Sequence, residues 1–268
     1  MKDKVVIITG ASSGIGKSLS EMLGRQEAKV VIAARNPDKL SQLEQALRKK
    51  NYDVLAVQTD VSIEEDCKKL IAETIKKFGS IDILINNAGI SMRAIFEDVN
   101  LKVIKQLMDT NFWGTVYCTK YALPYLLKNK GSVVGVSSVA GYKGLPGRTG
   151  YSASKFAMQG FLETLRIENM KKGLHVLIAC PGFTASNIRN TALAKDGSMQ
   201  GESPLDEEKL MTSETVAKYI IDAIEKRKHR IVLTTQGKLI VLLNKFFPKF
   251  MDKMVYNHMA KEPDSPFK

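Results

Sequence analysis

Short apolar segments alternate with helical patterns along most of the chain. Between the apolar segments, apolar residues recur at helical spacing. At one such place, Asn36 followed by Pro37 has the pattern of a helix N-cap and first helical residue. Strands that are apolar throughout and alternate with helices predict a parallel sheet covered on both faces. We therefore expect a doubly wound α/β fold of about seven strands. The predicted strands are Val5–Thr9, Lys29–Ala33, Val54–Gln58, Ile81–Ile85, Ser132–Ser137, His175–Ala179 and Ile231–Leu233.

Helices and a lid between and after these strands complete one predicted domain over residues 1–236. Ser62 has the position of a cap for a helix that ends at Phe78, and a long helix at about 102–128 changes character near Asn111. The helix that contains Tyr151 should end at about Lys171. Residues 183–211 are polar and irregular, which suits a substrate lid that becomes ordered on binding. Residues 237–268 form an additional C-terminal helical extension and tail.

A glycine-rich turn follows the first predicted strand. Gly10, Gly14 and Gly16 have the spacing G-x-x-x-G-x-G, which departs from the G-x-G-x-x-G dinucleotide fingerprint. Glycines let the backbone pass close to a pyrophosphate, and the N-terminus of the following helix attracts the anion. We therefore expect this turn to bind a dinucleotide. The residues expected to contribute are Gly10, Ser12, Ser13, Gly14, Ile15 and Gly16.

Tyr151 and Lys155 stand four residues apart in a predicted helix. At this spacing, two side chains project from one face, one turn apart. A neighbouring ammonium favours the phenolate form of a tyrosine, so the pair can donate and accept a proton near neutral pH. The pair alone is a weak signal, because an exposed tyrosine and a solvated lysine often occur at this spacing.

Three further motifs make the Tyr–Lys pair a strong signal. They are Thr9-Gly-Ala-Ser-Ser-Gly-Ile-Gly16, Asn86-Asn-Ala-Gly89 and Val136-Ser-Ser-Val139. Together with the Tyr–Lys pair, they resemble the short-chain dehydrogenase/reductase family over about residues 3–235. The resemblance implies a Rossmann-type fold and a nicotinamide cofactor. The rest of the sequence resembles the branch that holds hydroxysteroid dehydrogenases, related dehydrogenase/reductase members and 3-ketosphinganine reductases.

The resemblance also implies roles for single residues. Tyr151 would exchange a proton with the substrate oxygen, while Lys155 would stabilise the phenolate and bind the nicotinamide ribose. Ser138, which stands 13 residues before Tyr151, would hydrogen-bond the substrate. The backbone of Asn111 would hold a water that connects Lys155 to solvent. Further cofactor contacts are expected from Asp60 and Val61 at the adenine, Asn87, Ala88 and Gly89 at the ribose, and Pro181, Gly182 and Thr184 at the nicotinamide amide.

The end of the second strand favours NADP(H) over NAD(H). A carboxylate at this place would bind the ribose 2′-hydroxyl and repel a 2′-phosphate. This chain has Ala33-Ala34-Arg35 instead, and the guanidinium fork of Arg35 suits a phosphate. The alternative interpretation is that Arg35 is an ordinary surface arginine.

These residues predict an enzyme that interconverts a ketone and a secondary alcohol, in other words a carbonyl reductase or alcohol dehydrogenase. Apolar residues in the predicted lid, such as Phe183, Ile188 and Leu193, favour a hydrophobic, lipid- or steroid-like substrate. The alternative is a 3-oxoacyl-[acyl-carrier-protein] reductase, because a basic surface would suit an acidic carrier protein. Those enzymes, however, usually end soon after the last strand. A non-catalytic nucleotide sensor would have no need of Ser138, Tyr151 and Lys155 together.

Composition argues against several other classes. The net charge is +12, yet no nucleic-acid-binding module or aromatic-interleaved basic run accompanies it. No Cys/His cluster has metal-ligand spacing, so no metal is expected, and no G-x-S-x-G elbow surrounds Ser138 as in a hydrolase. Three scattered cysteines and an N-terminus without room for a signal peptide predict a cytoplasmic protein.

Two surfaces predict association. The helices at about 102–128 and 150–171 carry more apolar residues than one buried face needs, which predicts a homodimer or homotetramer. Beyond Gly237, apolar residues recur at helical spacing opposite Lys245, Lys249 and Lys253, and Pro248 should kink or divide the helix. This amphipathic extension could pack on a partner subunit, cap the substrate pocket, or contact a membrane surface as a peripheral helix.

Overall fold

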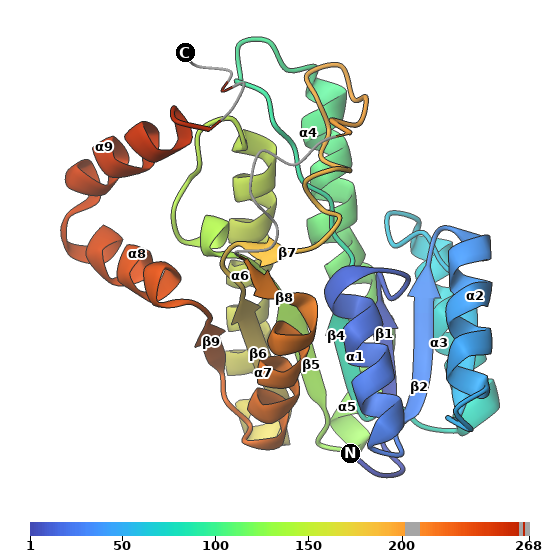
Figure 1. Cartoon of the computed structure of the whole chain (residues 1–268). Coiled ribbons are helices and arrows are strands. Elements are labelled where there is room, and N and C mark those ends of the chain that lie inside the picture. The colour runs from blue at the N-terminus through green and yellow to red at the C-terminus, as the bar shows by residue number, and fades with distance from the viewer. Residues whose placement is uncertain (202–209, 263–264, 266–268) are drawn as a thin grey trace.

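A parallel sheet of seven strands forms the centre of the part of the chain that the structure describes (Figure 1). The structure is a computed structural model that describes residues 1–201, 210–262 and 265. The strand order is β3-β2-β1-β4-β5-β6-β9, so the order reverses between β1 and β4. The carboxyl ends of strands at such a reversal form the usual ligand crevice of open α/β sheets. The strands are β1 (Val5–Thr9), β2 (Lys29–Ala34), β3 (Val54–Gln58), β4 (Ile83–Asn86), β5 (Ser132–Val136), β6 (His175–Cys180) and β9 (Arg230–Val232).

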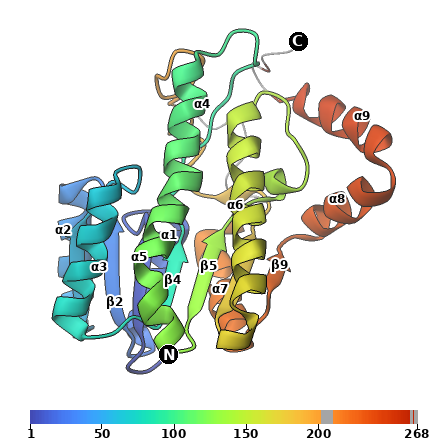
Figure 2. The same ribbon diagram turned by 180° about the vertical axis from the view of Figure 1, so that it is seen from behind.

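Alternate residues of each strand face opposite helical layers, because side chains alternate across a sheet. Val6 and Ile8 pack in the cluster that holds α1 (Gly14–Arg25), α2 (Pro37–Arg48) and α7 (Ser213–Glu225). Val5 and Ile7 pack in the other cluster, with α3 (Glu64–Phe78), α5 (Gly114–Lys128) and α6 (Thr149–Glu168). Figures 1 and 2 show one helical layer in front of the sheet and one behind it. The expected doubly wound fold is confirmed.

The long helix before β5 is interrupted where the sequence predicted. Its first part, α4 (Leu101–Leu107), passes into a π-helical segment at Met108–Trp113 and then into α5. Asn111 lies inside that segment and is fully buried. A π-helical turn shifts the register of the backbone hydrogen bonds, and such turns are frequent at functional sites.

Two predicted helix ends differ from the structure. Asn36 caps α2 as expected, since its Oδ1 accepts from the amide of Lys39 at 2.9 Å. Ser62 does not cap α3, however, because its hydroxyl donates to Asp60 Oδ1 at 2.7 Å. The helix therefore begins at Glu64, after Ile63. The helix that contains Tyr151 ends at Glu168, and a short 3-10 turn at Met170–Lys172 follows it.

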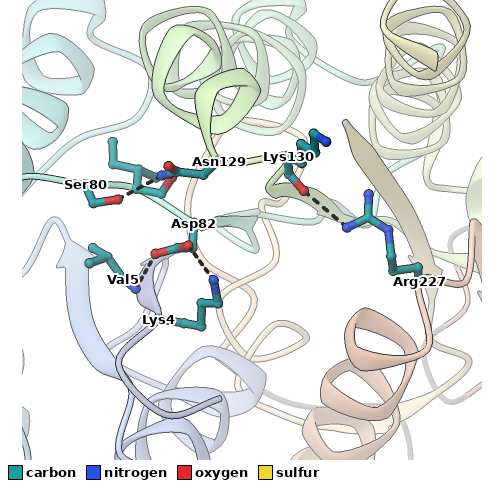
Figure 3. A network of polar contacts seen from close by, with 8 residues as sticks. Lys4, Val5, Ser80, Asp82, Asn129, Lys130 and Arg227 are labelled. Atoms are coloured by element: carbon teal, nitrogen blue, oxygen red, sulfur yellow. Dashed lines mark hydrogen bonds and ion pairs between the residues drawn. The ribbon is translucent and has the colours of Figure 1, made fainter. Parts of the chain in front are cut away.

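Polar contacts tie the connecting segments together at the amino ends of the strands (Figure 3). The carboxylate of Asp82 accepts from Lys4 Nζ at 2.9 Å and from the amide of Val5 at 3.0 Å. Nearby, Asn129 donates to Ser80 Oγ at 2.8 Å. β4 begins just after Asp82, at Ile83, two residues later than predicted. These contacts lie at the end of the sheet opposite the ligand crevice.

The C-terminal extension consists of two helices at the edge of the sheet beyond β9. Pro248 is the first residue of the second helix and so divides α8 (Thr235–Phe246) from α9 (Pro248–Met259). In Figure 1, α9 runs back toward the end of the molecule at which α4 lies. Buried Met251, Val255 and Met259 pack with Leu145 in the loop before α6. The extension is therefore attached to the side of the molecule that holds the crevice.

The predicted lid is described only in part. Its β7 (Thr184–Ala185) pairs in parallel with β8 (Met211–Thr212), and residues 202–209 lie outside the described residues. Residues 263–264 and 266–268 of the predicted tail also lie outside them. Within the described ranges, every helix is too short or too polar to cross a bilayer.

Candidate active site

A cavity of about 470 Å³ opens at the carboxyl ends of the central strands. It is lined by the glycine turn, by the ends of β4, β5 and β6, by the start of α6 and by the first residues of the lid. The predicted site residues that line it are Gly10, Ser12, Ser13, Gly14, Ile15, Arg35, Val61, Asn87, Ala88, Gly89, Ser138, Tyr151, Lys155, Pro181, Gly182 and Thr184. The fold thus brings together segments that lie far apart in the sequence.

The conformation of the glycine turn requires residues without a side chain at three positions, Gly10, Gly14 and Gly16. Gly10 and Gly14 have φ angles of 64° and 51°, which L-residues rarely adopt. A Cβ atom on Gly16 would lie 2.3 Å from the carbonyl oxygen of Gly10, so Gly16 allows the turn to close on the helix. Asn87 Nδ2 fixes the turn by donating to Thr9 O at 2.9 Å and to Gly10 O at 3.2 Å. The result is an open backbone cradle in front of the N-terminus of α1.

Ser138, Tyr151 and Lys155 face the same cavity from two elements. Ser138 follows β5, and its hydroxyl accepts from the amide of Ala140 at 3.1 Å. Tyr151 and Lys155 lie one turn apart on α6, with Lys155 Nζ 5.8 Å from the centre of the Tyr151 ring. Lys155 Nζ also donates to the carbonyl oxygen of Val136, the last residue of β5, at 2.9 Å. The hydroxyl of Ser138, the phenol of Tyr151 and the ammonium of Lys155 thus line one cavity.

Asn111 supports this group from behind. Its side chain accepts from the amide of Ile90 at 2.8 Å and donates to the carbonyl of Ile90 at 3.0 Å and to Ser154 Oγ at 2.9 Å. A Cβ atom on Gly89 would lie 3.2 Å from Asn111 Oδ1 and 3.4 Å from Lys155 Nζ. Asn111 therefore couples the segment after β4 to α6, although it does not line the cavity itself.

Burial and neighbouring groups shift the acidity of both catalytic candidates. Burial raises the pKa of Tyr151, while the Ser138 hydroxyl and the Arg148 cation act in the opposite direction. Burial lowers the pKa of Lys155 to about 8. A lysine that can lose its proton near neutral pH can take part in proton transfer, and strongly shifted groups in a cleft are typical of reaction centres.

Comparison with known proteins agrees with this geometry. The short chain dehydrogenase family matches residues 4–197, which is more than half of the chain. The chain belongs to the short-chain dehydrogenase family. It is 44% identical over 192 residues to the 11-beta-hydroxysteroid dehydrogenase-like protein 4A of Arabidopsis thaliana, a match that covers 71% of this chain and 64% of the relative. A second Arabidopsis protein, 11-beta-hydroxysteroid dehydrogenase-like 2, is 37% identical over 94% of this chain and 80% of its own length.

A solved structure supports the same fold. A short chain dehydrogenase/reductase from Burkholderia phymatum, in complex with NAD, superposes with a TM-score of 0.83 at 23% identity, covering 93% of this chain and 95% of the other. At this identity the likeness concerns the fold. The resemblance stated from the sequence motifs, to the hydroxysteroid dehydrogenase-like branch of this oxidoreductase family, is confirmed.

Some predicted cofactor residues of this short-chain dehydrogenase take other positions in the structure. Asp60 lies outside the cavity lining, and its Oδ1 accepts from the amide and the hydroxyl of Ser62. Thr59 and Val61, on either side of it, do line the cavity. Arg35 is exposed at the cavity rim, and Asn36 and Lys39 from the start of α2 line the same region.

Sequence reasoning missed several residues in this family member's site. Arg148 is buried, lines the cavity and directly precedes α6. Gln159 lies one turn beyond Lys155 and donates to Ser137 Oγ at 2.9 Å. Thr234 and Gly237, at the start of α8, also line the cavity. The continued i, i+4 spacing could have identified Gln159, but no local pattern indicated Arg148 or the residues of α8.

Proposed function

We propose that this chain is an NADP(H)-dependent oxidoreductase that interconverts a ketone and a secondary alcohol. The observation that carries the proposal is the convergence of Ser138, Tyr151 and Lys155 on the cavity that also contains the glycine cradle. The cradle suits a dinucleotide, because the glycine turn lines the cavity directly before the N-terminus of α1, where backbone amides attract a pyrophosphate. When bound there, a nicotinamide cofactor supplies or accepts a hydride.

The chain's own residues handle the substrate oxygen and its proton. In reduction, the Tyr151 hydroxyl donates a proton to the carbonyl oxygen, and in oxidation the phenolate accepts the alcohol proton. Ser138 hydrogen-bonds the same oxygen and fixes its position. The Lys155 ammonium stabilises the phenolate and binds the nicotinamide ribose, and the backbone of Asn111 is proposed to hold a water that connects Lys155 to solvent.

The remaining predicted contacts place the rest of the cofactor. Arg35 and Lys39 are the cations at the rim where a 2′-phosphate would lie, which supports NADP(H) rather than NAD(H). The proposal keeps Val61 at the adenine, Asn87, Ala88 and Gly89 at the ribose, and Pro181, Gly182 and Thr184 at the nicotinamide amide. For Asp60 a role at the adenine would require its carboxylate to exchange the contact with Ser62 for one with the ring.

The substrate is proposed to be hydrophobic. Apolar residues of the lid and its surroundings line the cavity, including Phe183, Ile188, Leu193, Met199 and Ile240. The alternative substrate is a 3-oxoacyl group on an acyl-carrier protein, which the chain's net charge of +12 would attract. The presence of Ile240 from the extension in the cavity wall favours the first substrate class.

Two associations belong to the proposal. We infer a homodimer or homotetramer through α5 and α6, where Trp113, directly before α5, and Phe156 of α6 are 43% and 46% exposed. We also infer a cytoplasmic enzyme that touches a membrane surface through α8 and α9. This rests on Phe246, Phe247 and Phe250, which are exposed beside the lysines of the same helices.

The test is NADPH oxidation with a panel of ketones that ranges from short and polar to long and apolar. Wild-type protein should turn over the apolar ketones, and Tyr151→Phe should lower kcat/KM by about 100-fold or more while NADPH affinity is retained. Near-normal turnover by Tyr151→Phe would contradict the assignment of the proton donor. A preference for carrier-bound 3-oxoacyl groups over free ketones would favour the alternative.

A further inference from the structure

Three charged side chains from distant parts of the chain meet beside the cavity. Arg93 follows β4, Arg148 directly precedes α6, and Glu262 follows α9. Glu262 Oε2 lies 3.5 Å from Nη2 of each arginine. The side chains of Arg93, Arg148 and Glu262 are 11%, 10% and 4% exposed. The end of the C-terminal extension thus carries a carboxylate into the interior, between two cations of the domain.

Such an arrangement is costly in free energy unless the charges compensate one another. Burying one charge without a partner is strongly unfavourable, whereas a buried pair contributes little net stability over apolar residues of the same volume. The neighbouring charged side chains of the extension that the structure describes, Asp252, Lys253 and Lys261, are exposed. The burial of Glu262 therefore calls for an explanation other than stability.

Arg148 connects this cluster to the reaction centre. It lines the cavity together with Tyr151 and stands three residues before it, at the N-terminus of α6. A cation at this place favours the phenolate form of Tyr151. The carboxylate of Glu262 offsets that cation and holds the guanidinium at the cavity wall.

We propose that Glu262 is a positioning residue, which anchors Arg148 and offsets its charge, so that the seating of the C-terminal extension sets the proton affinity of Tyr151. The inference rests on the proposed function, in which Tyr151 exchanges the proton. It assigns the extension a part in the reaction itself, in addition to lining the cavity through Gly237 and Ile240.

Several groups face Tyr151, and one of them, Arg148, pairs with Glu262 of the extension. Ser138 faces it from the end of β5, Lys155 from α6, Cys180 from the end of β6 and Arg189 from the lid. Burial raises the pKa of Tyr151 above its usual value and Cys180 adds to this, whereas Ser138, Arg148 and Arg189 act in the opposite direction. On the side of the cluster, Arg148 faces Glu262 and Arg93.

The test uses full-length protein and the titration of Tyr151, followed as the phenolate absorbance difference between a protein and its Tyr151→Phe counterpart. Glu262→Gln keeps the shape and removes the charge, so Arg148 acts uncompensated and the titration should move to lower pH, by about half a pH unit. Arg148→Met should move it to higher pH by a similar or larger amount. In the Arg148→Met background, Glu262→Gln should cause no further change, because its effect passes through Arg148.

Matched variants separate this role from a structural one. Lys261→Gln changes an exposed neighbouring charge and should leave the titration in place, and Glu262→Asp, which keeps the carboxylate, should retain most of the wild-type titration. If Glu262→Gln and Arg148→Met lower stability or turnover without moving the titration of Tyr151, the inference is wrong. It is also wrong if both variants move the titration in the same direction.

The titration distinguishes failure of this inference from failure of the proposed function. Opposite displacements in a protein that does not turn over any ketone would support the coupling and reject the reaction. Loss of turnover in Tyr151→Phe, together with an unmoved titration in both charge variants, would support the reaction and reject the coupling.

Discussion

The Nζ atom of Lys155 donates a hydrogen bond of 2.9 Å to the carbonyl oxygen of Val136, the last residue of β5. This contact joins the middle of α6 to the strand end from which Ser138 projects two residues later. The relative position of the lysine and the serine is therefore set by backbone, on the rigid part of the fold. The contact also keeps an ammonium in a buried environment, where its charged form is disfavoured.

The buried ammonium of Lys155 should lower the free energy of unfolding, so replacing Lys155 by an apolar residue should raise it. Its pKa falls from the usual 10.5 to about 8, so the unfolded chain binds the proton more tightly, and stability rises as pH increases from about 8 to 10.5. We expect Lys155→Met to abolish turnover yet to raise the free energy of unfolding at neutral pH by about 1–2 kcal/mol. Urea unfolding at several pH values measures this, with exposed Lys245→Met as control. A less stable Lys155→Met protein would contradict the prediction.

Arg35 should decide between the two nicotinamide cofactors. Arg35→Asp places a carboxylate where a 2′-phosphate would lie, so NADPH affinity should fall at least about tenfold while NADH affinity is kept or improved. Fluorescence titration with both cofactors measures the change. Lys50→Asp, an exposed substitution of the same charge beyond the far end of α2, is the control. Unchanged NADPH affinity in Arg35→Asp would remove the basis for the NADP(H) assignment.

The exposed aromatic residues of the extension should bind anionic membranes. Phe247 and Phe250 are 58% and 56% exposed, beside Lys245 and Lys249. Co-sedimentation with vesicles that contain anionic lipid should be strong at low salt and weaker at high salt. The Phe247→Ser/Phe250→Ser variant should lose most of this binding, whereas Tyr219→Ser, which alters a half-exposed aromatic on α7, should keep it. Equal binding by both variants would contradict the membrane contact.

His175 should make the fold sensitive to mild acid. Its Nε2 donates to the carbonyl of Lys228 at 2.9 Å, so its Nδ1 accepts from Ser132 Oγ at 2.9 Å. Burial lowers its pKa below 6.5, so stability is present above that value and is lost as pH falls through it toward the folded pKa. The free energy of unfolding should be lower at about pH 5.5 than at about pH 7.5, and this difference should be smaller in His175→Gln. Exposed His258→Gln should retain the wild-type pH dependence.

The aromatic surface of α5 and α6 should hold subunits together. Trp113 stacks on Tyr117, with ring centres 5.5 Å apart, and the exposed Phe156 of α6 belongs to the same proposed interface. Sedimentation at micromolar concentration should show a dimer or tetramer, and Trp113→Glu/Phe156→Glu should dissociate it. Tyr219→Glu is the matched control on another helix. A monomeric wild-type protein would reject the interface.

The sequence by itself determined the fold and indicated the centre of the candidate site. Alternating apolar strands and helices specify a parallel sheet, because each strand must be buried on both faces, and the local Tyr151–Lys155 spacing specifies one helix face. The sequence also predicted that the long helix changes character near Asn111 and that Pro248 divides the extension, and the second follows from the local backbone chemistry of proline. Helix ends were less predictable from the sequence, because the Ser62 hydroxyl has a competing partner in Asp60.

Only the tertiary structure decided which distant groups surround that centre. Arg148 and Glu262 are 114 positions apart, and nothing in either local sequence indicates that they meet. Lys155 likewise gains its low pKa from enclosure by segments far away in the chain. Periodicity and spacing report interactions within a few residues, whereas burial and charge pairing depend on how complete elements pack against one another, and this packing is settled by the whole chain at once.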